Sequence, residues 1–170
     1  MTVKITLDES DHRLATTEGT KRRMKCISEN RIQRNNFSGS EQTKLDNDIA
    51  GAFGELAAAK YLGLESHVFI EPLEIKGSVD LPPNIDVKCP RGHSRRLIIY
   101  INDDPNKIFL LATYEQPEVW LHGWTYGKRV MKDCFLEDPV GGRPAYFVRP
   151  SVLHPMPLLK DYLTDLGYRK

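Results

Sequence analysis

The sequence is poor in features that define several common classes of protein. It has three cysteines in 170 residues, at Cys26, Cys89 and Cys134, and none forms a CxxC pair. An odd number of widely spaced cysteines favours a reducing compartment over a disulfide framework. No apolar run approaches the roughly 18 residues that a membrane span needs. The alternating residues at 1–11 do not resemble a signal peptide, so we expect a cytoplasmic protein.

The sequence also has almost no excess of charge of either sign. Lys and Arg number 24 against 23 Asp and Glu, which gives a formal net charge of +1. This balance excludes a uniformly basic coat, although it permits a local phosphate-binding groove. The sequence has neither a Gly-rich P-loop nor a nucleophile elbow, which argues against those two classes of site. With 40% hydrophobic residues the chain can bury a core, and its length suits one domain.

Hydrophobic periodicity predicts an α/β or α+β domain with a central mixed sheet flanked by helices. We expect a single domain at 1–170, with an N-terminal extension at 1–44 and a C-terminal helical tail at 150–170. The predicted helices are 10–30, 45–62 with Gly63 placed to end it, and a short one ending at Gly167. The predicted strands are 3–7, 66–71, 85–89, 97–101, 107–114, 119–125 and 146–149.

Glu55 lies on an unusual face of the helix predicted at 45–62. A solvent-facing glutamate usually has polar neighbours at the offsets that share its helical face. Here those neighbours are small or apolar, which would let the helix approach another element closely. A carboxylate on such a face needs a charged or metal partner, because burying it unpaired is costly. The alternative is an exposed glutamate beside a patch of small residues. The neighbours are Gly51, Ala52, Ala58, Ala59 and Leu62.

The strand predicted at 85–89 carries a second candidate pair. Alternate side chains of a strand share a face, so Asp86 and Lys88 project together, about 6 to 7 Å apart at their α-carbons. Asp80 precedes a rigid turn at 81–84 that could return it to the side of Asp86. Two adjacent carboxylates repel unless a cation lies between them. With the carbonyl of Val87 they would form an oxygen site suited to Mg²⁺ or Mn²⁺.

The ordered set of Glu55 on a helix, then Asp80, then Asp86-x-Lys88 on a strand resembles the PD-(D/E)XK nuclease superfamily. The segment GAFGELAAAKYLG at 51–63 resembles the first core helix of its small phage and prokaryotic members. Gly123-Trp124 and Gly127-Lys128 resemble a later strand and turn. The likeness covers about residues 45–128.

The resemblance implies a restriction-endonuclease-like core and metal-dependent hydrolysis of phosphodiester bonds, most naturally in DNA. It implies that Asp80 and Asp86 bind Mg²⁺ or Mn²⁺ with the Val87 carbonyl, that Glu55 is a further ligand, directly or through water, and that Lys88 positions the attacking water. Glu71 and Glu74 are the fallback ligands if Asp80 points away. The location would be the cytoplasm of a bacterial or phage-infected cell, and a homodimer is plausible.

Two basic segments are candidates for contacting nucleic acid, since arginine can grip phosphate through two parallel hydrogen bonds. The alternative for each is a solvated surface. The candidate residues are Lys21, Arg22 and Arg23 in the N-terminal helix, Arg91, His93, Arg95 and Arg96 after the Asp-x-Lys strand, and Lys128.

Three weaker possibilities accompany this interpretation. Cys89 and His93 have a zinc-like spacing, but a structural zinc site needs four ligands. Trp120 and Trp124 would share a face of a regular strand, where bases could stack on them, although strand aromatics more often belong to a core. The protein could also keep a nuclease-like fold as an inactive nucleic-acid-binding or accessory protein.

Overall fold

The computed structural model describes residues 2–29, 39–69, 79–90 and 95–168. Its strands form two sheets, one of four strands in the order β1-β5-β4-β2 and one of three in the order β3-β7-β6. In the first sheet β2 runs parallel to β4 and the other pairs are antiparallel. The elements are β1 (Val3–Thr6), α1 (Glu9–Ser28), α2 (Glu41–Leu62), β2 (Ile85–Lys88), β3 (Leu97–Tyr100), β4 (Ile108–Glu115), β5 (Glu118–Tyr126), α3 (Gly127–Val130), β6 (Leu136–Glu137), β7 (Ala145–Val148) and α4 (Met156–Asp165).

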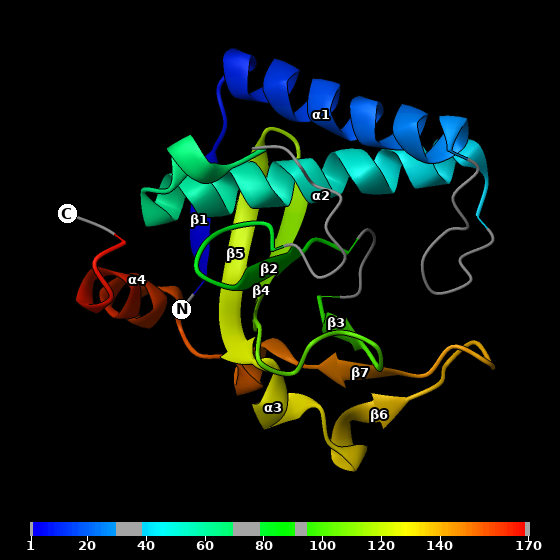
Figure 1. The fold of residues 1–170 in the computed structure, drawn as a ribbon, viewed down its shortest axis with the longest axis vertical. Helices are drawn as coiled ribbons and strands as arrows, with labels where there is room; N and C mark the ends of the chain where they lie inside the picture. The colour runs from blue at the N-terminus through cyan, green and yellow to red at the C-terminus, as the bar shows by residue number, and fades with distance from the viewer. Residues whose placement is uncertain (1, 30–38, 70–78, 91–94, 169–170) are drawn as a thin grey trace.

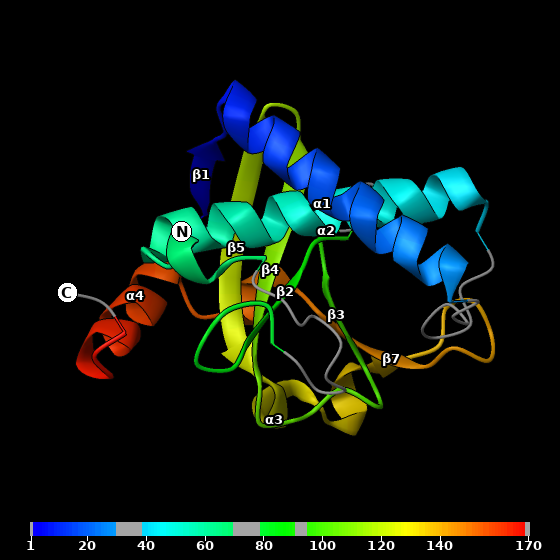
Figure 2. The ribbon, with the colours of Figure 1, turned by 45° about the horizontal axis from the view of Figure 1, so that its top comes forward.

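Helices α1 and α2 lie in two layers on one face of the first sheet. Figures 1 and 2 show α2 against the strands and α1 crossing on its outer side, while the second sheet lies at the opposite end with α3. β1 pairs with β5, so the N-terminal strand and helix belong to the same fold as the rest. No helix in the described ranges is long and apolar enough to span a membrane.

Helix α1 begins with a capping box, in which the Asp8 carboxylate accepts from the Asp11 amide at 2.9 Å and the reverse bond measures 3.0 Å. Gly19 in its middle is intrinsically unfavourable for a helix. A β-carbon on Gly19 would lie 2.5 Å from the Ile49 α-carbon. The glycine therefore permits the close approach of α1 to α2.

Helix α2 begins one turn earlier than the predicted residue 45. The Ser40 hydroxyl accepts from the Thr43 amide at 3.2 Å and satisfies a donor at the first turn. The predicted end is confirmed, because Gly63 adopts the left-handed conformation with φ of 72°.

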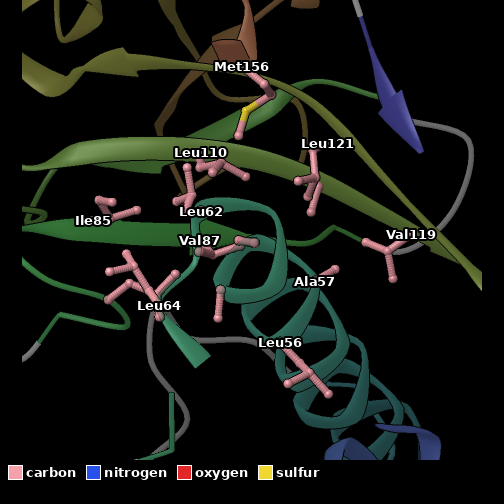
Figure 3. Close-up of a cluster of buried hydrophobic side chains, with 14 of the residues drawn as sticks. Leu56, Ala57, Leu62, Leu64, Ile85, Val87, Leu110, Val119, Leu121 and Met156 are labelled. Atoms are coloured by element: carbon pink, nitrogen blue, oxygen red, sulfur yellow. The ribbon is translucent and has the colours of Figure 1, made fainter. Parts of the chain in front are cut away.

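The main core lies between α2 and the first sheet. Figure 3 shows Leu56, Ala57 and Leu62 of α2 gathered with Val87 of β2 and Leu110 of β4. Strand β4 is buried on both faces. Its residues Phe109 and Leu111, on either side of Leu110, point to the other face and belong to a separate apolar cluster with β3 and β7. One central sheet was expected, but β4 separates two cores and the chain forms two sheets.

Most predicted strands are confirmed within about a residue, but the strand at 66–71 is wrong where the structure describes it. Residues Glu65–His67 form a 3₁₀ turn instead. Residues 70–78, with the fallback ligands Glu71 and Glu74, lie outside the described ranges. The short elements β6 and α3 had no prediction, because two and four residues carry too little periodicity.

The two tryptophans of β5 do not share a face. The β4–β5 register shifts between Leu111 and Ala112, so that His122 is an extra residue between paired positions. Trp124 therefore joins the main core, with 6% of its surface exposed. Trp120 lies on the other face under the Lys4 ammonium, 5.7 Å from the ring centroid. The regular strand required for a shared stacking platform is absent.

Candidate active site at the edge of the first sheet

Asp80 returns to the side of β2 through the turn at 81–84. Its amide donates to the Ile85 carbonyl at 3.0 Å, and its carboxylate Oδ2 accepts from the Val87 amide at 2.7 Å. The carboxylate thus takes a hydrogen bond at the edge of the strand, one residue beyond Asp86. The turn brings the two acids into the same neighbourhood, as the sequence predicts.

Asp86 and Lys88 project from one face of β2, as the alternation predicts. Lys88 Nζ lies 2.8 Å from Asp86 Oδ1 and 3.3 Å from Asp103 Oδ2. Lys107 Nζ donates to Asp86 Oδ2 at 3.4 Å. The Lys88 ammonium also lies over the Phe109 ring, 5.4 Å from its centroid. The lysine is therefore held from three directions.

The neighbouring acids raise the pKa of both Asp80 and Lys88, which disfavours the charged form of the acid and favours the charged form of the lysine. Burial raises the pKa of Asp80 well above its usual value, and the charges of Glu55 and Asp86 raise it further. Burial alone would lower the pKa of Lys88, but the charges of Asp86 and Asp103 more than offset this and raise it. Lys88 is accordingly a cation in this setting, suited to donating hydrogen bonds and stabilising negative charge.

Glu55 is buried, with 5% of its surface exposed, and it has the charged partner that its position requires. Arg22 of α1 donates to both its carboxylate oxygens, from Nη1 at 2.6 Å and from Nη2 at 2.7 Å. Arg22 Nε also donates to Glu18 Oε1 at 3.0 Å. The alternative of a solvent-exposed glutamate is therefore wrong.

The acids approach the edge of the sheet from different faces. Val87 packs into the core that α2 and its Glu55 border. Asp86 alternates with Val87 and pairs in register with Phe109, whose side chain belongs to the second cluster. Asp80 lies at the strand edge between them. Across the described ranges, no three His, Cys, Asp or Glu side chains converge closely enough to hold a metal ion.

The net charge of this cluster still favours a divalent cation. Its five acids outnumber its three basic groups, so the cluster carries a net negative charge when all are ionised. Carboxylate oxygens are the ligands that Mg²⁺ prefers, and the ion commonly keeps several waters. Asp80 and Asp86 therefore fit such an ion as donors. The acids are Glu18, Glu55, Asp80, Asp86 and Asp103, and the bases are Arg22, Lys88 and Lys107.

The predicted phosphate-contacting residues are found in different settings. Arg22 and Arg23 turn inward, and Arg23 lies 3.7 Å from Asp48 with only 6% of its surface exposed. Lys21, Arg95 and Lys128 are exposed. Arg96 Nη1 contacts both Glu137 oxygens at 2.9 Å and lies over the Phe147 ring. Arg91 and His93 lie outside the described residues. The zinc-like pair of Cys89 and His93 therefore lies partly outside them as well.

Three residues of the cluster had no place in the sequence prediction. Glu18 lies one helical turn before Arg22, a spacing that could have indicated the pair. Asp103 and Lys107 belong to the polar segment 102–107, which is typical of a turn. The sequence gives no sign that this turn folds back against Lys88, because the contact depends on the long-range pairing of β2 with β4.

Comparisons with protein-family models, with curated proteins and with solved structures each found no match.

Proposed function

We propose that this protein is a metal-dependent nuclease that hydrolyses phosphodiester bonds, with DNA as its substrate. The observation that carries the proposal is the position of Asp80. Its carboxylate is fixed on the Val87 amide at 2.7 Å, and its pKa rises because burial and two neighbouring acids oppose its ionisation. A divalent cation would relieve that repulsion. The resemblance of the ordered acidic and lysine residues to the PD-(D/E)XK superfamily supports the same reaction.

Each residue has a distinct role in this proposal. Asp80 and Asp86 would hold Mg²⁺ or Mn²⁺, which would stabilise charge on the phosphate and activate a water. Lys88 would orient that water and stabilise the negative charge that develops on the oxygens of the phosphate under attack. Its two carboxylate neighbours, at 2.8 and 3.3 Å, fix the ammonium in place before substrate arrives.

Two exposed basic side chains are candidate contacts for the phosphates of the substrate. Arg95 follows the Asp-x-Lys strand, and two-thirds of its side chain (66%) is exposed. Lys128 is exposed in α3, and its ammonium lies 5.7 Å from the centroid of the Tyr126 ring. Both could neutralise phosphates without disturbing the fold, and binding through them would weaken with salt.

Cleavage of labelled linear, nicked, branched and single-stranded DNA and RNA with Mg²⁺ or Mn²⁺ tests the function. We expect metal-dependent cleavage of DNA, and a rate reduced at least about 10²-fold in Asp86→Asn and in Lys88→Ala. The first variant removes a charged metal ligand, and the second removes the cation that would stabilise charge on the reacting phosphate. Asp104→Asn is the matched control, since Asp104 is exposed and its carboxylate accepts from Asn106 within the same turn.

Other outcomes point to other functions. Undiminished cleavage by both site variants would show that the chemistry lies elsewhere in the chain. Salt-sensitive DNA binding without turnover would favour a non-catalytic binding module. Absence of both binding and cleavage would favour an accessory protein.

A further inference from the structure

The Arg22–Glu55 pair leaves neither oxygen of Glu55 without a strong partner. Both oxygens accept from the guanidinium, at 2.6 and 2.7 Å, in the two-pronged geometry that suits arginine and carboxylate. The side chains are 22% and 6% exposed. Glu18 completes the arrangement by accepting from Nε. The glutamate is thus a fully satisfied member of an internal ion pair.

Recruiting Glu55 to a metal would break this pair. Arg22 would then lose the carboxylate that compensates its charge in a mostly buried setting, and breaking such a pair is strongly unfavourable. The Coulomb attraction of a divalent cation would also have to overcome the repulsion of the guanidinium beside it. The pair therefore resists entry of the metal on this side.

The placement of the acids on the sheet supports the same conclusion. Glu55 approaches Asp80 from the α2 face of β2, whereas Asp86 projects from the opposite face beside Phe109. A cation shared by Asp80 and Asp86 would therefore be held by residues on the side of β2 away from α2. Arg22, which also interacts electrostatically with Asp80, supplies positive charge on the near side.

We propose that Arg22 keeps Glu55 out of the coordination shell, so that the site takes up a single divalent cation on Asp80 and Asp86. The inference rests on the proposed function. It departs from the family resemblance, which makes Glu55 a ligand. In this arrangement Glu55 acts as a positioning residue for Arg22.

The test is a Mn²⁺ titration followed by electron paramagnetic resonance and calorimetry, which count bound ions without any turnover. We expect one ion per wild-type chain. Asp86→Asn should weaken binding at least about tenfold, since it removes a direct charged ligand. The double variant Arg22→Gln/Glu55→Gln replaces the ion pair by two neutral amides of similar size, and its affinity should stay within about threefold of the wild type.

The single variant Arg22→Gln sharpens the test. It removes the competing cation and frees a carboxylate near Asp80, so Mn²⁺ affinity should rise severalfold or a second ion should bind. Its melting temperature should fall without metal and recover more with Mn²⁺ than the wild type gains. Melting curves of every variant separate loss of folding from loss of binding.

Three results would overturn the inference: two ions on the wild type, a tenfold loss in the double variant, or an Arg22→Gln variant that keeps both the affinity and the single ion of the wild type. These are distinct from failure of the proposed function. If wild-type protein binds no Mn²⁺ and cleaves nothing, the proposed function fails. If binding and cleavage depend on Asp86 and also on Glu55, only the role given to Arg22 fails.

Discussion

Arginines meet acids in two very different parts of this molecule. In the helical layer, Arg22 of α1 grips Glu55 of α2, and the two side chains are 22% and 6% exposed. In the second sheet, Arg96 contacts Glu137 in a similar two-oxygen fashion, but those side chains are 34% and 47% exposed. Each arginine contacts both oxygens of its partner, Arg22 through two nitrogens and Arg96 through one, and the two pairs differ most in their exposure to water.

The two pairs differ in whether water can hydrate the charges that are left when the pair is broken. When a surface pair is broken, solvent rehydrates both groups, so such a pair contributes little to stability. When a buried partner is removed, the remaining charge has no such compensation. A run of basic residues in a sequence can therefore form a surface for phosphate or supply counter-ions to buried acids. Arg22 of α1 is a counter-ion of the second kind.

The largest expected effect comes from breaking the buried pair. Arg22→Ala should lower the free energy of unfolding by about 3 kcal/mol, because it leaves Glu55 buried and unpaired. Arg96→Ala should cost less than about 1 kcal/mol at the exposed pair. Urea unfolding at neutral pH measures both, and equal losses would refute the contrast between the two regions.

A smaller effect should follow from separating the two helices. Gly19→Ala places a methyl group 2.5 Å from the Ile49 α-carbon, so α1 and α2 must move apart. We expect a loss of about 1 to 3 kcal/mol, since overpacking outweighs the better helix propensity of alanine. Gly51→Ala is the matched control on α2, where no heavy atom lies within 4 Å of the added carbon. It should stabilise the protein by up to about 1 kcal/mol, and a similar loss in both would contradict the packing argument.

The smallest effect concerns an exposed arginine acting at a distance. Burial lowers the pKa of His122, the positive charge of Arg95 lowers it further, and Glu115 acts in the opposite direction. The folded state thus favours the neutral ring, and its contribution to stability is present above the free value of about 6.5 and is lost as the pH falls through the folded pKa.

Arg95→Gln should therefore raise the pKa of His122, as followed by an NMR titration of the ring. Glu115→Gln should lower it. The pKa of His154, which is lowered by burial and then by Arg129, serves as the internal control and should not move. If the pKa of His122 is unchanged in both variants, solvent screens the charges of Arg95 and Glu115 from the ring.

The sequence is a good guide where a local rule determines the structure. Gly63 ends α2 as predicted because a left-handed residue is needed there, and the Asp8 region caps α1. Alternation places Asp86 and Lys88 on one face. These features depend on neighbours within a few residues. The division into two sheets could not be predicted, because a fully buried strand such as β4 is apolar on both faces and does not reveal that each faces a different core.

The candidate site shows the same division between local and long-range information. The small residues around Glu55 correctly indicate a buried acid that needs a partner, but not which one. Arg22 is 33 positions away, and only the crossing of α1 over α2, made possible by Gly19, brings the two together. The contact of Asp103 with Lys88 likewise depends on strand pairing, which no local pattern encodes.

The bulge at His122 has a practical consequence for watching this protein fold. By reversing the face of the strand between Trp120 and Trp124, it gives the chain two fluorophores in unlike surroundings. Trp124, with 6% exposure, emits from within the main core, whereas Trp120 emits from the edge where β1 pairs with β5. With either ring replaced by phenylalanine, the remaining one reports on its own region. The docking of the N-terminal strand and the closing of the core can thus be timed separately.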